Sequence, residues 1–211
     1  MPPQLALFDA ASRTVFDDAS GSVTYTPGVV APALSGHWFD TLRDGVGWKS
    51  ERRVMYEREV EVPRLLASFR LAELRAPARA PATERVHAVL REAAQRVSAH
   101  TGVSFDSVGL NFYRDGRDSV APHNDHLDEL EPGAPIALLS LGAARRMTIR
   151  AKAPPPRVLK LELEPGSVLV MSYATQLNYD HGIPKTREPV GARISLAFRV
   201  RPRSDPAGTR Y

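Results

Sequence analysis

The second half of the chain is a series of short strand-like runs, and this feature constrains the fold most. Turn-forming residues separate the runs, among them Asp115-Gly116, Pro132-Gly133 and the three prolines at 154–156. Many short strands at this spacing are typical of a β-sandwich or barrel. We therefore predict an all-β C-terminal half, built from FDSVGLNFY, PIALLSLG, RRMTIRA, RVLKLELEPG, SVLVMSY and RISLAFRV.

The first half carries helical patterns instead. Apolar residues recur every four positions over 32–46, which predicts a helix there. A second apolar stripe runs from Val86 to Val97, and Gly102 supplies the stop for that helix. For the rest of this half we expect an irregular segment over 1–30 with a short strand at Val23–Tyr25, extended segments at 53–62 and 64–70 on either side of Pro63, and a Pro/Ala-rich loop over 71–82.

Composition narrows the possible function classes. The chain has no Cys, so disulfides, thiolate metal ligands and Cys nucleophiles are excluded, and any metal must be held by His, Asp or Glu. No apolar run is long enough to span a bilayer, and the N-terminus does not resemble a secretion signal. We therefore expect an intracellular, cytoplasmic protein without membrane contact.

The chain is basic, with a formal net charge of +4. Basic residues gather in three stretches, which is compatible with a polyanionic partner but equally with an ordinary solvated surface. These stretches are Lys49, Arg52, Arg53 and Arg58, then Arg145, Arg146, Arg150 and Lys152, then Arg199, Arg201 and Arg203.

Two segments carry candidate metal ligands. His123 and Asp125 are two residues apart, so on an extended segment both side chains face the same side and can reach one ion. His181 stands in a predicted loop after the run SVLVMSY. Two His and one carboxylate form the facial triad of non-haem iron(II) oxygenases, which leaves three coordination positions open. Each piece alone is weak, since an isolated His is more often a surface or hydrogen-bonded residue.

Polar groups on two predicted strands could hold a cosubstrate. In RISLAFR, Arg193, Ser195 and Arg199 share one face, while the apolar residues between them share the other. The two arginines lie roughly 20 Å apart along a straight strand, so they cannot grip one small carboxylate together. Asn111 and Tyr113 likewise share a face. For an isolated segment, an exposed surface strand explains the arginines equally well.

Taken together and in order, these segments resemble the AlkB family of iron(II)- and 2-oxoglutarate-dependent dioxygenases. The resemblance covers roughly residues 53–200 and rests on NFYRDGRDSVAPHNDH, PGAPIALLSLGAARRMTIR, EPGSVLVM with the following YDHGIPK, and RISLAFR. It implies a double-stranded β-helix, or jelly roll, with an N-terminal α/β extension. We thus expect one domain, with the extension and a base-recognition lid over 1–102, the core over 103–203 and a tail over 204–211.

The resemblance also implies the chemistry. His123, Asp125 and His181 would bind Fe(II). Five residues would bind 2-oxoglutarate: Asn111, Tyr113, Arg193, Ser195 and Arg199. With O2, such an enzyme removes alkyl groups from nucleobases of DNA or RNA by oxidation and releases aldehyde, succinate and CO2. The base must first leave its stack to reach the metal. We expect a monomer.

Departures from the family pattern affect substrate choice. Relatives often carry an acid directly after the metal Asp, whereas this chain has His126 and Leu127 there. Neither supplies the attraction that an acid offers to a cationic base, so we expect weaker preference for cationic lesions and relatively better handling of neutral adducts such as etheno bases. The alternative is that Asp128 or Glu129, one or two positions later, restores the acid. Asn124, His126 and Leu127 are the candidate base contacts, and Tyr56 is the candidate for stacking on the base. Ser195 and Ala197 replace the polar pair that is common in relatives.

Two other functions remain open from the sequence. The first is a 2-oxoglutarate-dependent hydroxylase of a protein or small molecule, against which the basic stretches argue mildly. The second is a non-catalytic nucleic-acid binder of the same fold, which would have no use for a metal triad or for paired arginines.

Overall fold

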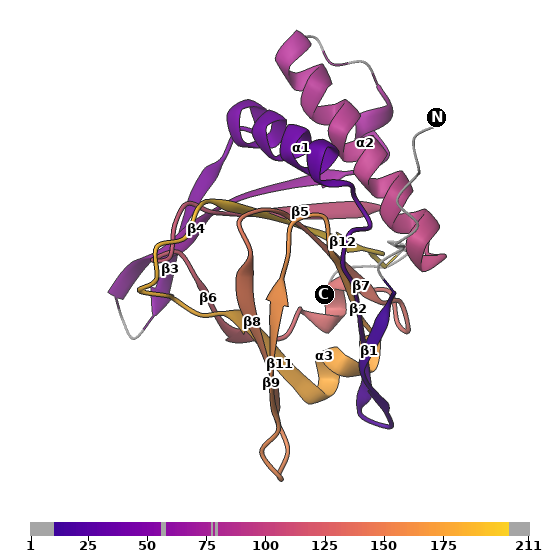
Figure 1. Cartoon of the computed structure of the whole chain (residues 1–211), viewed down its shortest axis with the longest axis vertical. Coiled ribbons are helices and arrows are strands. Elements are labelled where there is room, and N and C mark those ends of the chain that lie inside the picture. Colours follow the sequence, from indigo (N-terminus) through magenta and orange to yellow (C-terminus); the bar gives the residue numbers. More distant parts are fainter. Residues whose placement is uncertain (1–10, 56–57, 77, 79, 203–211) are drawn as a thin grey trace, which may run out of the picture.

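Two β-sheets face each other in the computed structural model, which describes residues 11–202 apart from 56–57, 77 and 79 (Figure 1). The larger sheet has the spatial order β1 (Arg13–Asp18), β2 (Gly21–Thr26), β10 (Val168–Met171), β7 (Ile136–Gly142), β12 (Arg193–Arg199), β5 (Ser107–Tyr113), β4 (Arg58–Arg70) and β3 (Lys49–Met55). The smaller sheet has the order β6 (Val120–His123), β11 (Tyr179–Ile183), β8 (Arg145–Ala151) and β9 (Val158–Leu163).

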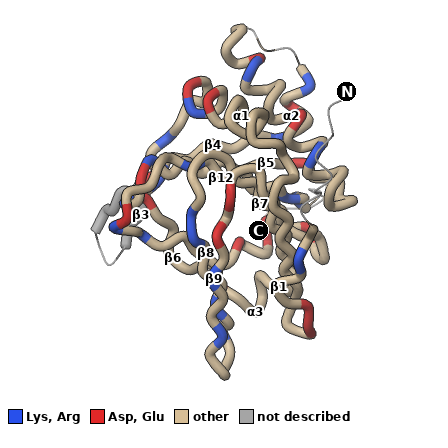
Figure 2. Tube along the Cα trace, viewed as in Figure 1, with Lys and Arg blue, Asp and Glu red and all other residues tan. Residues whose placement is uncertain are grey.

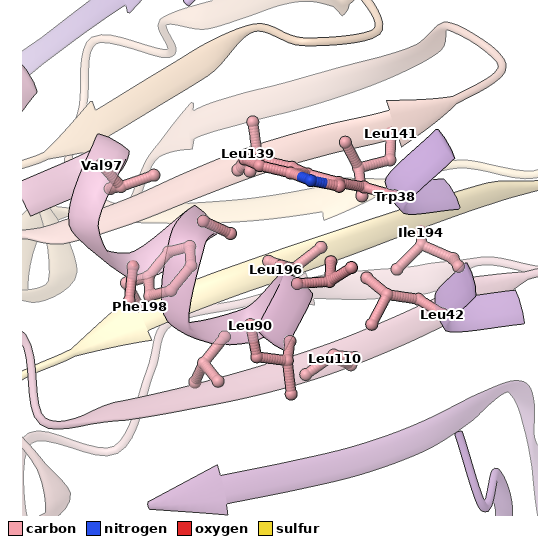
Figure 3. Close-up of a cluster of buried hydrophobic side chains, with 14 of the residues drawn as sticks. Trp38, Leu42, Leu90, Val97, Leu110, Leu139, Leu141, Ile194, Leu196 and Phe198 are labelled. Carbon is pink, nitrogen blue, oxygen red and sulfur yellow. The ribbon is translucent and has the colours of Figure 1, made fainter. Parts of the chain in front are cut away.

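Helices α1 (Pro32–Gly45) and α2 (Pro81–Thr101) cover the outer face of the larger sheet (Figure 1). Their apolar stripes pack against every second residue of β5, β7 and β12. Figure 3 shows Trp38 and Leu42 of α1 and Leu90 of α2 close to sheet residues such as Leu196. Both predicted helices are confirmed, and Gly102 ends α2 in the left-handed conformation with φ of 72°.

A second apolar cluster fills the space between the sheets. It includes Leu138 and Leu169 from the larger sheet and Met147 and Ile149 from the smaller one. On β12, Ile194, Leu196 and Phe198 point to the helices, so the alternate residues point to the space between the sheets. Ala197 lies in that inner cluster, which confirms the predicted division of this strand into two faces.

All six runs predicted as strands contain one, but several boundaries differ. The short strand predicted at Val23–Tyr25 is confirmed as part of β2, which forms a hairpin with β1. β1 itself lies in the part that we expected to be irregular; the sequence carries no strand signal there, since β1 is mostly exposed and has little apolar alternation. Pro63 does not divide two strands: β4 continues through it. The pairing of β3 with β4 is irregular opposite Pro63, so no ladder hydrogen bond is required from its nitrogen.

Short helices occupy parts of two segments for which we predicted a strand and a loop. The run SVLVMSY ends as a strand at Met171, because Ser172 caps the short helix α3 (Tyr173–Asn178) and accepts a hydrogen bond from the Thr175 backbone nitrogen. The predicted loop over 71–82 contains a 3-10 turn, η1 (Glu73–Arg75), and the first residues of α2. Another 3-10 turn, η2 (Leu127–Glu129), follows β6. Among the described residues, no helix is long and apolar enough to cross a membrane.

Candidate metal centre

Neighbouring strands of the smaller sheet hold the two candidate histidines side by side. His123 ends β6 and His181 lies on β11, and the two are direct partners in the antiparallel register. Their ring centroids are 4.6 Å apart. The prediction that His181 lies in a loop is therefore wrong. Asp180 and Gly182 gave a turn signal, but pairing with β6 and β8 on both sides keeps this segment extended.

Asp125 completes the cluster from a loop just beyond β6. Its backbone nitrogen donates a hydrogen bond to Oε1 of Gln176 at 3.2 Å. Its carboxylate Oδ2 accepts a hydrogen bond from Nε of Arg199 at 2.8 Å and forms an ion pair with Nη2 of the same guanidinium, also at 2.8 Å. The other oxygen, Oδ1, lies 4.0 Å from Nε2 of His123. Arg199 thus holds one carboxylate oxygen and leaves the other facing the histidines.

The three side chains could hold one metal ion. Their ligand atoms all lie within 4.8 Å of one another, and the described part of the chain contains no other such group of His, Asp or Glu. Two imidazoles and one carboxylate suit iron(II) and leave coordination positions open. The donor set therefore fits the predicted Fe(II).

The electrostatics favour the protonation states that a metal needs. Burial lowers the pKa of His181 to about 4, and the nearby His123 adds to this effect. Burial opposes ionisation of Asp125, but the charge and the hydrogen bond of Arg199 outweigh it, so the pKa of this carboxyl lies below its ordinary value. At neutral pH the cluster therefore offers a neutral imidazole at His181 and an ionised carboxylate, and neither has to lose a proton to bind a metal.

Arg193 is a buried cation whose hydrogen bonds are only partly satisfied. Its side chain is 1% exposed, which excludes the exposed surface strand considered from the sequence. Nη2 donates to Oγ of Ser140 at 2.9 Å, whereas Nε and Nη1 have no acceptor. Unpaired buried donors of a charged group are costly, so an anionic ligand is expected here. The far carboxylate of 2-oxoglutarate would supply that acceptor and fits the site.

Other polar groups surround Arg193 on the inner face of the larger sheet. Tyr113 lies between two guanidinium groups, with the Arg193 and Arg145 carbons 5.3 and 5.6 Å from its ring centre. Burial raises the pKa of the Tyr113 hydroxyl despite these nearby cations, so it remains a hydrogen-bond donor at neutral pH. Ser195 is buried in register between Asn111 on β5 and Ser140 on β7. The structure thus gathers the five predicted cosubstrate residues on β5 and β12.

Sequence reasoning missed several residues of this region. Arg64 donates to Oδ1 of Asn111 at 2.7 Å, and Ser140 receives Arg193. Arg145, which the sequence places in a basic stretch, is 3% exposed and donates to the carbonyls of Asp115, Asp118 and Pro184. Its role is to fix two loops, not to attract a polyanion. The sequence held no signal for these contacts, since each depends on pairing between distant strands.

The predicted base contacts lie in and around the loop after β6. Asn124 is engaged within the protein, because its amide donates to the backbone carbonyl of Asp125 at 2.9 Å. His126 is exposed, and Leu127 packs partly against the cluster between the sheets. Glu129, the acid two positions further on, is paired with Arg201. Tyr56 lies outside the described residues, so its stacking role stays a prediction.

Comparisons with known proteins agree with this geometry. Residues 22–199 match the family model described as the 2OG-Fe(II) oxygenase superfamily. Bovine alpha-ketoglutarate-dependent dioxygenase alkB homolog 3 is 33% identical over 202 residues, which cover 90% of this chain and 69% of that protein. Human DNA oxidative demethylase ALKBH2 is 37% identical over 118 residues, which cover 53% of this chain and 45% of that protein. The chain thus spans about half the length of human ALKBH2.

Two solved structures share the fold at low sequence identity. A prolyl-4-hydroxylase from Pseudomonas putida superposes with a TM-score of 0.52 and 14% identity, covering 85% of this chain and 93% of that one. The epimerase SnoN from nogalamycin biosynthesis gives a TM-score of 0.55 and 15% identity, covering 89% and 84%. These neighbours support the predicted jelly-roll core, which is open here and not a closed barrel. The chain belongs to the 2OG-Fe(II) oxygenase superfamily and, within it, to the AlkB family.

Proposed function

We propose that this protein is an iron(II)- and 2-oxoglutarate-dependent dioxygenase that removes alkyl groups from nucleobases in DNA or RNA. One observation carries the proposal. A His-Asp-His cluster and a buried guanidinium with two free donors lie at opposite ends of the inner face of β12, where Arg199 contacts the cluster and Arg193 provides the donors. A metal site and an anion site linked in this way fit a metal-chelating dicarboxylate.

Each part of the site has a distinct task in this proposal. His123, Asp125 and His181 hold Fe(II), which together with 2-oxoglutarate and O2 supplies the oxidising power for hydroxylation of the alkyl carbon. Arg193 binds the far carboxylate of 2-oxoglutarate, and its planar fork suits a carboxylate better than a lysine would. Arg199 keeps Asp125 ionised and fixes which carboxylate oxygen faces the metal. The hydroxylated group then leaves as an aldehyde.

Surface charge supports a polyanionic substrate. The segment 145–163, which contains β8 and β9, has six basic residues and one acid. Arg145 is buried and the Lys152 ammonium donates within the protein, which leaves four basic residues and one acid. Figure 2 shows Lys and Arg along both strands. Arg146, Arg150 and Lys160 are exposed there, although Glu162 and Asp180 pair with the two arginines. The names of the relatives add support, since human and bovine ALKBH2 are DNA oxidative demethylases.

The direct test of the catalytic centre is run both without nucleic acid and with added oligonucleotides. We would incubate the protein with Fe(II), 2-oxoglutarate and O2 and measure succinate, because family chemistry consumes the cosubstrate slowly without a substrate. The proposal predicts succinate from the parent and none from Asp125→Ala, with both proteins folded by circular dichroism. A folded parent that forms no succinate in the presence of alkylated or unmodified oligonucleotides would support a non-catalytic nucleic-acid binder instead.

A further inference from the structure

The Lys152 ammonium, just beyond β8, connects the segments that carry the candidate metal ligands. Its Nζ donates to Oδ1 of Asn124 at 2.8 Å and to the backbone carbonyls of Gln176 at 2.9 Å and Leu177 at 3.1 Å. It also lies 3.9 Å from Oδ1 of Asp180. An ammonium has three hydrogen-bond donors, so all of them are used, and none remains for solvent or substrate.

Three of the four residues that Lys152 contacts adjoin or contact a candidate metal ligand. Asn124 stands between His123 and Asp125, and its amide also donates to the Asp125 carbonyl. Gln176 receives the backbone N–H of Asp125 on its side-chain oxygen, and this side chain is fully buried. Asp180 is the neighbour of His181 in β11. One cation therefore touches residues next to all three candidate ligands.

The loop that carries Asp125 needs such support. β6 ends at His123, so no ladder hydrogen bond holds the two residues that follow. The contacts to Asp125 and its neighbour come from Arg199, Gln176 and Lys152. A ligand on an unsupported loop must be ordered when the metal binds, and this ordering costs affinity.

We propose that Lys152 is a positioning residue of the metal centre, which fixes the loop of Asn124 and Asp125 against the end of α3 and the start of β11. The inference rests on the proposed metal centre and adds a residue to it. Lys152 is not part of either apolar cluster, and its side chain is 34% exposed. Its removal should therefore alter the metal centre and leave the fold intact.

The experiment is a titration with Co(II) alone, followed through its visible absorption bands, which report ligand geometry. Changes just outside a metal's ligand shell typically cost about 10–100-fold in metal affinity. We expect Lys152→Met to raise the Co(II) dissociation constant by about tenfold or more and to shift the bands. Lys185→Met is the matched control, because Lys185 is exposed and outside this cluster. It should bind Co(II) like the parent.

A double variant separates positioning from a general loss of stability. Asn124→Ala should also weaken Co(II) binding, but by less in the Lys152→Met background than in the parent, because both changes break the same contact. If Lys152→Met lowers the melting temperature enough to prevent titration, the Co(II) affinity of Asn124→Ala alone tests whether this contact positions the metal centre. A parent-like dissociation constant in that variant overturns the inference.

The inference and the proposed function can fail separately. If the parent and His181→Ala bind Co(II) equally, the metal centre itself is wrong. If the parent binds tightly, His181→Ala does not, and Lys152→Met matches the parent in affinity and spectrum, the metal centre stands and the role of Lys152 is refuted.

Discussion

Among single residues, Arg193 gives the most specific prediction about how the cosubstrate binds. Arg193→Ala removes a buried cation whose Nε and Nη1 donors lack acceptors. Truncating one side of a buried charge pair costs roughly 3–5 kcal/mol, so we expect the 2-oxoglutarate requirement to rise more than about a hundredfold. Arg201→Ala is the control, since Arg201 pairs with Glu129 beyond the end of β12. The measurement is succinate formation against 2-oxoglutarate concentration, and parent-like curves for both variants would refute the assignment.

A substitution at Leu127 can test whether this site distinguishes cationic from neutral bases. An acid at this position would attract a cationic methylated base, whereas His126 and Leu127 carry no negative charge. The next acids along the chain are Asp128, which is exposed, and Glu129, which pairs with Arg201. We expect Leu127→Glu to shift product ratios towards the cationic base when it competes with a neutral etheno base in one oligonucleotide. Mass spectrometry reads both products. An unchanged ratio, with both proteins active, would show that this position does not read charge.

Some residues of the candidate site could be predicted from the sequence and others could not, for physical reasons. His123 and Asp125 are two positions apart, and Arg193 and Arg199 share a strand face, so local periodicity was enough to group each pair. Gln176 and Lys152 reach Asp125 and Asn124 only after β6, β8 and α3 have come together. No local pattern predicts such contacts.

At the scale of elements, the close approach of β6 and β11 sets the distance between His123 and His181. A Cβ atom at Gly182 would lie 2.9 Å from the Val120 carbonyl oxygen and 3.0 Å from the Pro122 nitrogen, both in the β6 backbone. Backbone atoms cannot turn aside as a flexible side chain can, so the strands must separate.

We therefore expect Gly182→Ala to weaken Co(II) binding on the order of tenfold, the size typical of changes just outside a ligand shell. Gly36→Ala is the control, because nothing lies within 4 Å of a Cβ atom there. A parent-like titration of folded Gly182→Ala would show that this close approach does not set the ligand geometry.

The outer face of β8 and β9 is where we expect nucleic-acid phosphates. Arg146→Gln combined with Lys160→Gln should weaken oligonucleotide binding and flatten its dependence on salt, by roughly 0.7–0.9 in the logarithmic slope for each phosphate that the protein no longer neutralises. Arg43→Gln with Arg96→Gln, which lie on α1 and α2 and pair there with acids, should leave both quantities unchanged. Fluorescence anisotropy at several salt concentrations makes the comparison. Equal slopes in the parent and the Arg146/Lys160 variant would move the nucleic-acid surface elsewhere.

Helices and strands with a clear periodic pattern of apolar residues could be predicted from the sequence. Strands that stay extended only because they pair with neighbouring strands could not. α1, α2 and β7 have clear apolar patterns of their own. β1 is mostly exposed, and β11 carries Asp180 and Gly182, which are typical of turns. Pairing with β2 in one case, and with β6 and β8 in the other, keeps them extended.

In the molecule as a whole, the two sheets contribute different residues to the candidate site. The smaller sheet supplies His123 and His181, and the larger sheet supplies Arg193, Arg199 and Tyr113. Strands from before residue 102 belong to the larger sheet, as Figure 1 shows, and Arg64 on β4 contacts Asn111. The function of residues 1–102 as a lid over the base stays a prediction, as does the monomeric state.

Oxidation of a damaged nucleic acid is the decisive test of the proposed function. We would incubate the protein with Fe(II), 2-oxoglutarate, O2 and a panel of oligonucleotides, DNA and RNA, that carry single methylated or etheno bases, and follow base mass and aldehyde release by mass spectrometry. We predict restoration of the unmodified base in at least one oligonucleotide, matched by aldehyde and succinate, and abolished in His181→Ala. Succinate formation without any change in base mass across the whole panel would contradict the account and indicate a protein or small-molecule substrate.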